Sequence, residues 1–309
     1  MRILVTGASG FIGKALAFRL LEQGHEVYGL SRHPFSDNSR LTPLYGDVIL
    51  PNLGIDQYLG NIDAVYHLAA VLRLGPDKNG EIWRTNVDGT SNVIQFCRDH
   101  RVPRLYFCST AYTIGGGRNI YEKSKIACEK MISERLPHST IFKPSIVIGD
   151  GDNFVLSNLS QFISILIRVH RRAEIIRRKV EGSLRLPVME PVFRFQGRPE
   201  GKLNLVKLED VVKSMSEIKE EGNYWLTNSH PPSLGEVSSW IGEEILVRLE
   251  VLLFFSPSPL ESLFHRLSLP FSPYLQGDDF PSDIKRGSPI TKEVVHDSIL
   301  HLLNLTRDK

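Results

Sequence analysis

The sequence predicts an α/β fold, a doubly wound parallel sheet with a smaller, mostly C-terminal lobe. Short apolar runs rich in β-branched residues alternate with helix-length segments over the first half of the chain, which is the pattern of a parallel sheet covered by helices. A glycine-rich stretch, TGASGFIG at 6–13, joins the first such run to the first helix. We expect residues 1–150 to form a nucleotide-binding core and residues 151–309 a substrate-binding lobe, with segments at about 203–230 returning to the core.

The composition is typical of a globular protein. Of 309 residues, 41% are hydrophobic and 23% are charged, and the formal net charge of +2 gives no reason to expect a nucleic-acid partner. The three cysteines lack metal-ligand spacing and suit a reducing compartment, so we expect a cytoplasmic protein without a metal site. They are Cys97, Cys108 and Cys128.

Two features bear on targeting and membranes. The first predicted strand begins at the initiator methionine, so we expect no leader peptide. The longest apolar run, Ile245–Phe255, is interrupted by Arg248 and Glu250 and is too short to span a bilayer. We therefore expect no transmembrane segment.

The glycine-rich stretch is the strongest functional signal in the sequence. It lies between a short apolar strand, Ile3–Val5, and a helix, Ala15–Leu21. Gly7 permits a tight turn, Gly10 lets the backbone approach a phosphate, and Gly13 allows close packing of helix on strand. Backbone N–H groups and the positive helix end then face a pyrophosphate. The pattern predicts a Rossmann-type dinucleotide site with contacts from Gly7, Ser9, Gly10, Phe11 and Ile12.

The end of the second predicted strand bears on the choice of cofactor. His25–Leu30 is that strand, and Ser31 stands where an acidic residue would bind the adenosine ribose. The next residue, Arg32, can pair with a 2′-phosphate, which favours NADP(H) over NAD(H). A solvated surface arginine is the alternative explanation.

The third and fourth predicted strands add contacts to the nucleotide. Leu41–Tyr45 is followed by Asp47 and Val48, which we expect beside the adenine. His67 lies inside the fourth strand, Ala64–Ala70, and we expect it to be a hydrogen-bonded core residue rather than a catalyst. The small residues that end this strand let the cofactor lie against the backbone of Leu68, Ala69 and Ala70.

A threonine, a tyrosine and a lysine form the candidate catalytic set. Thr110 follows the fifth predicted strand, Leu105–Cys108, and Tyr121 and Lys125 begin a helix that runs to about Arg135. Residues i and i+4 share a helix face. The lysine ammonium lowers the pKa of a tyrosine, whose ordinary value of about 10 suits neutral pH poorly. We expect Thr110 to hold a substrate oxygen, Tyr121 to exchange its proton, and Lys125 to assist and to bind the nicotinamide ribose.

The second half of the chain follows a different pattern. Thr140–Ile148 is a sixth predicted strand, and one or two helices follow within 154–180. Further strands are expected at 203–207 and 224–227. Ser233 is expected to be the N-cap of a helix at Leu234–Leu246.

A run of basic residues marks the predicted helix region after residue 160. A solvated helix face explains these charges, and the alternative is a docking patch for an anionic substrate handle such as phosphopantetheine or a nucleotide phosphate. The residues are Arg168, Arg171, Arg172, Arg177, Arg178 and Lys179.

Over nearly its whole length, the chain resembles the extended short-chain dehydrogenase/reductases, a superfamily that includes NAD-dependent epimerases and dehydratases. The resemblance implies that the threonine, tyrosine and lysine are a catalytic trio. It also implies that Asn86 supports a proton relay and that Pro144 and Ile146 pack near the nicotinamide. The matching segments are TGASGFIG at 6–13, Asp47, HLAA at 67–70, Asn86, CST at 108–110, YEKSK at 121–125, KPS at 143–145 and LEDV at 208–211.

Within that superfamily the chain looks most like the thioester-reductase and fatty acyl-CoA reductase branch, whose members use NADPH to reduce an acyl thioester to an aldehyde. The short segment 114–120 suggests an open site for a bulky or elongated acyl chain, lined by Phe154, Leu156 and Phe162. The thioester would arrive on a carrier protein or as a coenzyme A ester. The similar segments are GDVILPNLGI at 46–55, HLAAVL at 67–72, STAY at 109–112, YEKSKIACEK at 121–130, KPSIVIGDG at 143–151 and LNLVKLEDVV at 203–212.

We therefore expect an NADP(H)-dependent oxidoreductase that reduces a carbonyl or an acyl thioester by hydride transfer. Two alternatives stay open. A nucleotide-sugar epimerase or dehydratase would share the fold, although Ser31 and Arg32 disfavour the NAD that such enzymes usually hold. A non-catalytic NADP(H)-binding regulatory protein would keep the fold without turnover, and the intact trio disfavours it. A homodimer is compatible with the sequence.

Overall fold

The computed structural model describes residues 1–33, 40–149, 158–184 and 192–307. The chain forms two compact units, and each unit collects segments from distant parts of the sequence. Unit 1 comprises Met1–Ser145, Leu208–Thr227 and Pro281–Gly287, and unit 2 comprises Ile146–Lys207, Asn228–Phe280 and Ser288–Lys309.

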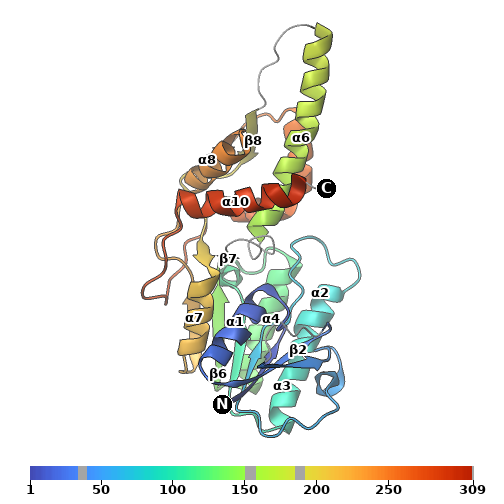
Figure 1. The fold of residues 1–309 in the computed structure, drawn as a ribbon, viewed down its shortest axis with the longest axis vertical. Helices are drawn as coiled ribbons and strands as arrows, with labels where there is room; N and C mark the ends of the chain where they lie inside the picture. Colours follow the sequence, from blue (N-terminus) through green and yellow to red (C-terminus); the bar gives the residue numbers. More distant parts are fainter. Residues whose placement is uncertain (34–39, 150–157, 185–191, 308–309) are drawn as a thin grey trace. The chain divides into compact units, whose positions relative to one another are not determined.

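Unit 1 is built on a seven-stranded parallel sheet (Figure 1). Its strands are β1 (Arg2–Thr6), β2 (Glu26–Ser31), β3 (Leu41–Tyr45), β4 (Ala64–His67), β5 (Leu105–Cys108), β6 (Ser139–Pro144) and β10 (Gly222–Leu226). Their spatial order is β10-β6-β5-β4-β1-β2-β3. The chain starts inside the sheet, moves outward to β3, and then returns to β4 on the other side of β1. This reversal confirms the predicted doubly wound sheet. In open sheets of this kind, ligands bind at the carboxyl ends of the strands where the order reverses, here β1 and β4.

Helices cover both faces of this sheet. α1 (Phe11–Glu22) and α7 (Leu208–Glu217) pack together on one face. There the rings of Tyr66, Tyr106 and Phe142 stack in a row, and the Tyr66 hydroxyl donates to the carbonyl of Met215 in α7 (3.1 Å). On the other face, α3 (Gly89–Asp99) and α4 (Ile120–Arg135) bury their apolar sides against the strands.

Two element boundaries differ from the sequence prediction because side chains replace backbone partners. The fourth strand ends at His67 rather than Ala70, since the N–H of Ala69 donates to the Thr6 hydroxyl oxygen (3.3 Å) instead of to a neighbouring strand. The segment 86–90 is the predicted start of the next helix, but that helix opens five residues before Asn86 as α2 (Glu81–Trp83), where the Asp77 carboxylate accepts the first amides. It continues through a π-helical turn (Arg84–Asp88) into α3.

The predicted sixth strand, Thr140–Ile148, is two strands. β6 ends at Pro144 in the sheet of unit 1, and β7 (Ile146–Ile148) pairs in unit 2 with β9 (Leu205–Lys207). The chain passes from one unit to the other at Ser145. One predicted strand therefore serves two different sheets.

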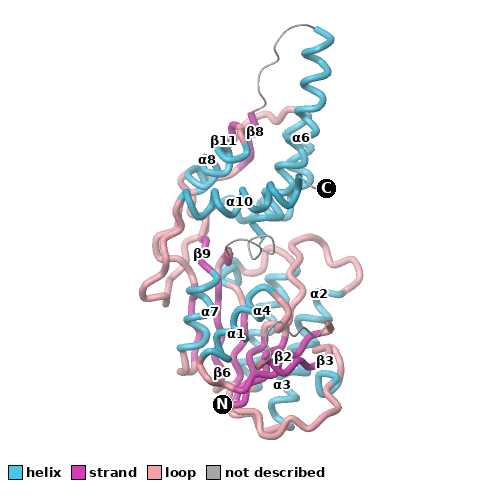
Figure 2. Tube along the Cα trace, in the orientation of Figure 1, coloured by secondary structure: helices cyan, strands magenta, loops and turns pink. Residues whose placement is uncertain are grey.

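Unit 2 combines helices with two short parallel strand pairs (Figure 2). One pair is β7 with β9, and the other is β8 (Val192–Gln196) with β11 (Arg248–Leu252). The helices are α6 (Asn158–Leu184), α8 (Leu234–Ile245), α9 (Pro259–Ser268) and α10 (Lys292–Arg307).

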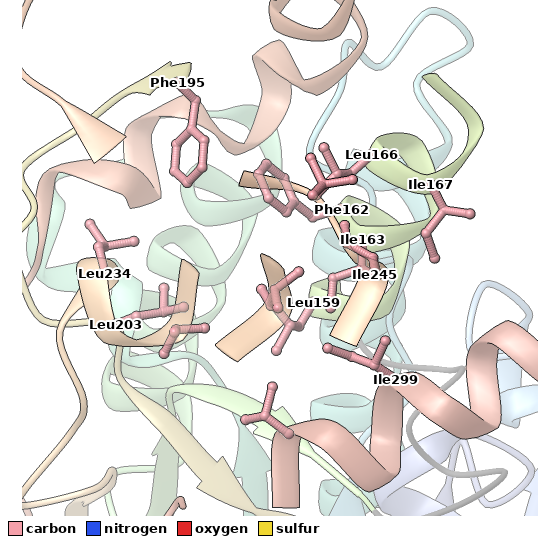
Figure 3. Packing of buried hydrophobic residues seen from close by; sticks show 14 of the residues in the cluster. Leu159, Phe162, Ile163, Leu166, Ile167, Phe195, Leu203, Leu234, Ile245 and Ile299 are labelled. Atoms are coloured by element: carbon pink, nitrogen blue, oxygen red, sulfur yellow. The ribbon is translucent and has the colours of Figure 1, made fainter. Parts of the chain in front are cut away.

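The core of unit 2 is aromatic and aliphatic (Figure 3). The ring of Phe162 in α6 makes edge contacts with Phe195, Phe264 and Phe271. Ser233 caps α8 as predicted, with a reciprocal bond from the Glu236 side chain. Among the described residues, no helix is long and apolar enough to cross a membrane.

Candidate active site

The glycine turn after β1 is held against β2 and against the loop after β4. The N–H groups of Gly7 and Ala8 both donate to the carbonyl of Leu30 (3.0 and 3.3 Å). Gly7 has φ of +71°, and a Cβ there would lie 2.7 Å from the nitrogen of Ala69. A Cβ on Gly13 would lie 2.2 Å from the Gly7 carbonyl oxygen. The segments meet backbone to backbone, which requires glycine at both positions.

The start of α1 has the features of a phosphate site. Gly10 is the N-cap residue, and its own N–H donates to the Gly7 carbonyl (2.9 Å). Ser9 and Gly10 are exposed, Phe11 and Ile12 are half-buried, and the first turn carries no acidic side chain. The first amides of a helix have no intrahelical acceptor, and its positive end favours an anion. The predicted phosphate contacts therefore lie together.

Arg32 lies at the same edge of the sheet as the glycine turn. Its side chain is exposed two residues after Leu30, whose carbonyl holds the turn. Ser31 is buried, and its hydroxyl donates to the carbonyl of His33 (2.9 Å). A cation next to the glycine turn is thus open to solvent.

Asp47 and Val48 occupy the loop after β3. One Asp47 carboxylate oxygen accepts the N–H of Ile49 (3.2 Å). Val48 is buried, and a Cβ on Gly89 in α3 would lie 2.7 Å from its side chain. Val48 therefore packs directly on the α3 backbone. Leu68, Ala69 and Ala70 are half-buried in the loop after β4.

A directed chain of hydrogen bonds runs from β1 to the π-helical turn. The Thr90 hydroxyl donates to the carbonyl of Asn86 (2.5 Å), so its oxygen accepts a hydrogen bond from Nε2–H of His67 (3.0 Å). Nδ1 of the neutral ring then accepts the Thr6 hydroxyl (2.7 Å). Burial lowers the pKa of His67 to about 3. His67 is a hydrogen-bonded core residue, as expected.

His67 should make the protein less stable in mild acid. The unfolded imidazole binds a proton below pH 6.5, whereas the folded one stays neutral to about pH 3. The free energy of unfolding should therefore fall as the pH drops, by about 2 kcal/mol from this group between pH 6.5 and pH 5. Urea unfolding at both pH values should show a smaller drop for His67→Gln, whose amide can keep both contacts. An equal drop in the two proteins would refute this assignment.

Asn86 joins the loop after β4 to α4. Its side-chain oxygen accepts the N–H of Val71 (2.8 Å), and its amide donates to the Val71 carbonyl (3.2 Å). The amide also donates to the hydroxyl of Ser124 (2.9 Å), which donates to the carbonyl of Tyr121 (2.7 Å). Asn86 thus links the loop that carries Ala70 to the helix turn that carries Tyr121.

Tyr121 and Lys125 lie together on the first turns of α4. Nζ of Lys125 is 5.9 Å from the Tyr121 ring centre and 4.7 Å from that of Phe107. The ammonium donates to the carbonyl of Cys108 (2.7 Å), and both the lysine and the tyrosine are buried. Burial lowers the pKa of Lys125, and the nearby Cys108, Cys128 and Glu129 act in the opposite direction.

Thr110 lies at the carboxyl ends of β5 and β6. Its hydroxyl donates to the carbonyl of Pro144 and accepts the N–H of Tyr112, both at 3.4 Å. The Thr113 hydroxyl donates to the Thr110 carbonyl (3.1 Å). The Thr110 hydroxyl and the Pro144 carbonyl are thus in contact. Ile146 belongs to unit 2, where its N–H donates to the carbonyl of Asn204 (3.1 Å).

An ion pair behind Thr110 is absent from the sequence prediction. The carboxylate of Glu129 accepts Nζ of Lys143 (2.7 Å) and the hydroxyl of Ser109. Lys143 also donates to the Thr113 hydroxyl (3.4 Å). The pair therefore fixes the residues on both sides of Thr110. Glu129 lies four residues after Lys125, and that spacing is the only local signal that it faces the same region.

The short segment before α4 is anchored by a second ion pair. The carboxylate of Glu122, which is fully buried, accepts the backbone N–H of Arg118 (2.7 Å) and its guanidinium (3.2 Å). The guanidinium also lies 5.2 Å from the ring centre of Tyr112. These contacts hold the backbone immediately before Tyr121.

A family model described as the NAD dependent epimerase/dehydratase family matches residues 3–178, which is more than half of the chain. The chain belongs to this family. The glycine turn, the end of β2 and the α4 residues described above all lie within the matched region.

Part of this chain is similar in sequence to curated oxidoreductases. It is 30% identical over 179 residues to a 3-beta-hydroxysteroid dehydrogenase of Mycolicibacterium neoaurum, covering 49% of each chain. It is 37% identical over 113 residues to a 2-alkyl-3-oxoalkanoate reductase of Stenotrophomonas maltophilia, covering 36% of this chain and 33% of the relative. The chain thus matches about half the length, or less, of these relatives.

Solved structures share the fold of this chain over nearly its whole length. The terminal R domain from the myxalamid PKS-NRPS biosynthetic pathway has a TM-score of 0.72 at 18% identity, covering 99% of this chain and 91% of that domain. MoeE5 in complex with UDP-glucose and NAD has a TM-score of 0.66 at 19% identity, covering 99% and 100%. At this level of identity the likeness concerns the fold.

Proposed function

We propose that the protein is an NADP(H)-dependent oxidoreductase that reduces a carbonyl group with the trio Thr110, Tyr121 and Lys125. The observation that carries this proposal is the buried Lys125 ammonium, 5.9 Å from the Tyr121 ring centre and bonded to the β5 end that leads into Thr110. A buried cation beside a tyrosine favours the phenolate, so the tyrosine can act as a general acid or base at neutral pH.

The proposed roles follow from these positions. When bound, the nicotinamide supplies the hydride. Thr110 donates a hydrogen bond to the substrate oxygen, and Tyr121 transfers its proton to that oxygen as negative charge develops there. Lys125 stabilises the resulting phenolate. Asn86, through Ser124, holds the helix turn of Tyr121, and the Glu129–Lys143 pair holds the backbone around Thr110.

The glycine turn supports nucleotide binding by the same chain. Gly7 and Gly13 let the turn and α1 pack backbone to backbone, and the exposed Gly10 would let a pyrophosphate approach the helix start. We propose further contacts from Ser9, Phe11 and Ile12. Asp47 and Val48 would border the adenine, and Leu68, Ala69 and Ala70 would lie along the cofactor. Pro144, at the end of β6, would pack near the nicotinamide.

Arg32 should give a preference for NADPH. A guanidinium at the end of β2 can form charge-assisted bonds with the 2′-phosphate. We expect NADPH to bind about tenfold more tightly than NADH, a gap of about 1.4 kcal/mol, and Arg32→Ala to remove most of it. Fluorescence titration measures both affinities, with Arg135→Ala, another exposed arginine of unit 1, as the control. Equal affinities of the wild type would exclude this role.

The substrate proposed is a carbonyl compound or an acyl thioester. The named activities of the curated relatives, a steroid dehydrogenase and an oxoalkanoate reductase, support carbonyl chemistry. A carrier protein or coenzyme A would deliver the thioester, with unit 2 as the substrate lobe. Of the predicted acyl-chain lining, Phe154 and Leu156 lie outside the described residues. Phe162 is instead a core residue of unit 2, because its ring packs among other phenylalanines.

A substrate panel tests the proposed function. The purified protein is mixed with NADPH and, in separate samples, with aldehydes, ketones or acyl-CoA esters. A further sample contains NADP⁺ and 3-hydroxysteroids. Nicotinamide absorbance is followed in every sample. We expect net NADPH oxidation with a carbonyl or thioester, and free thiol in the second case. Conversion of a nucleotide sugar without any net change in nicotinamide would instead favour an epimerase, which the family model also covers.

A further inference from the structure

The second half of α6 has an exposed surface that does not pack into the core of unit 2. In the first half of the helix, Leu159, Phe162, Ile163, Leu166 and Ile167 point into the hydrophobic cluster (Figure 3). Beyond His170, no described side chain of α6 is buried. This part of the helix extends past the other labelled elements of unit 2 in the orientation of Figures 1 and 2. It therefore contributes little to the core.

The exposed residues of α6 fall on one side of the helix. Successive residues turn by about 100°, so positions 168, 171, 172, 175, 176, 178 and 179 occupy one half of the circumference. The buried hydrophobic positions from 159 to 169 occupy the opposite half. We name the exposed side the α6 stripe; it consists of Arg168, Arg171, Arg172, Ile175, Ile176, Arg178 and Lys179.

The α6 stripe combines positive charge with two exposed apolar side chains. It has five cationic residues and no acidic one, although the whole chain has a net charge of only +2. Glu174 lies on the other half of the helix, where it pairs with the guanidinium of Arg177 (2.8 Å) and, at a longer distance, with that of Arg178 in the stripe (3.8 Å). Ile175 and Ile176 are 57% and 62% exposed between the cations. Ile175 lies opposite the buried side, whereas Ile176 lies at the edge of the exposed half, about 20° from the direction of the buried Val169.

We propose that the α6 stripe docks on an anionic lipid surface. Clustered cations on an amphipathic helix bind the headgroups of acidic lipids, and branched apolar side chains between them enter the boundary of the acyl region. A protein partner would need a larger apolar centre with aromatic anchors, and two isoleucines do not supply it. A second copy of the chain would not dock through the same stripe, because the two sets of positive charges would repel each other. This inference does not depend on the proposed reaction.

Vesicle binding by the full chain tests the proposal. We expect sedimentation with vesicles of phosphatidylcholine and phosphatidylglycerol but not with phosphatidylcholine alone, and release when salt rises from about 0.1 M to about 0.5 M. Arg178→Glu/Lys179→Glu should weaken binding about tenfold or more. The matched control is Lys130→Glu/Lys213→Glu, which changes the net charge equally at exposed lysines of unit 1.

A second variant separates insertion from attraction by charge alone. Ile175→Ser/Ile176→Ser keeps every charge and removes two exposed side chains, so the fold should be unaffected, yet binding should fall several-fold. Three results would overturn the proposal: no binding of the wild type to the acidic vesicles, equal weakening by the Lys130/Lys213 control, or binding to a polyglutamate peptide or duplex DNA without binding to vesicles.

Discussion

Replacing Tyr121 with phenylalanine should lower turnover by about a hundredfold or more, the usual effect of losing a general acid. The change removes one hydroxyl and keeps the ring that packs beside Lys125 and Phe107. NADPH affinity and thermal stability should therefore stay close to those of the wild type. Steady-state kinetics on the substrate found by the panel, with NADPH titration of the same samples, measures both quantities.

Two further variants sharpen this expectation. Tyr28→Phe removes a hydroxyl that bonds to the exposed Glu26 (2.6 Å) and should have little effect on turnover. Lys125→Met should reduce both turnover and NADPH affinity, because we assign Lys125 to both. Near-normal activity of Tyr121→Phe would show that another group handles the proton.

Replacing Gly13 with alanine should displace the turn that forms the proposed nucleotide site and lower the stability of unit 1. The new methyl carbon would lie 2.2 Å from the carbonyl oxygen of Gly7 and 2.9 Å from its carbonyl carbon. Both are backbone atoms of the tight turn, so the turn or α1 must move. We expect a loss of about 1–3 kcal/mol in stability, typical of overpacking. NADPH affinity should fall about tenfold or more, because a displaced helix start no longer presents its amides to the phosphates.

A second glycine in a helix serves as the control. A methyl group on Gly182 in α6 would meet no described atom within 4 Å, so Gly182→Ala should leave NADPH binding unchanged. It should also leave stability equal or slightly higher. Fluorescence titration and thermal unfolding compare the two variants. Unaltered NADPH binding by Gly13→Ala would mean that the turn is not the phosphate site.

The parts of the fold that could be predicted are those that local chemistry determines. The glycine turn requires Gly7 and Gly13 whatever surrounds it, and the capping box at Ser233 needs only Glu236 three residues later. The alternation of strands and helices then leads to the doubly wound sheet.

The parts that could not be predicted depend on partners far away in the sequence. The amide of Asn86 bonds to Ser124, 38 residues away, and the residue lies within a π-helical turn that no local pattern indicates. Lys143 and Glu129 are 14 residues apart on a strand and a helix, and only the packing of α4 on the sheet brings them together. The break at Ser145 likewise depends on a distant partner, because β7 leaves the first sheet to pair with β9.

Isotope transfer from the cofactor tests the central claim most directly. The protein is incubated with NADPH deuterated at the transferable position of the nicotinamide and with the substrate identified by the panel. Mass spectrometry of the product and absorbance of the cofactor should show one deuterium in the product for each NADPH oxidised. The rate of this deuterium transfer should be much lower in Tyr121→Phe. Product that forms without deuterium, and without net oxidation of NADPH, would contradict the assignment of this protein as a carbonyl reductase.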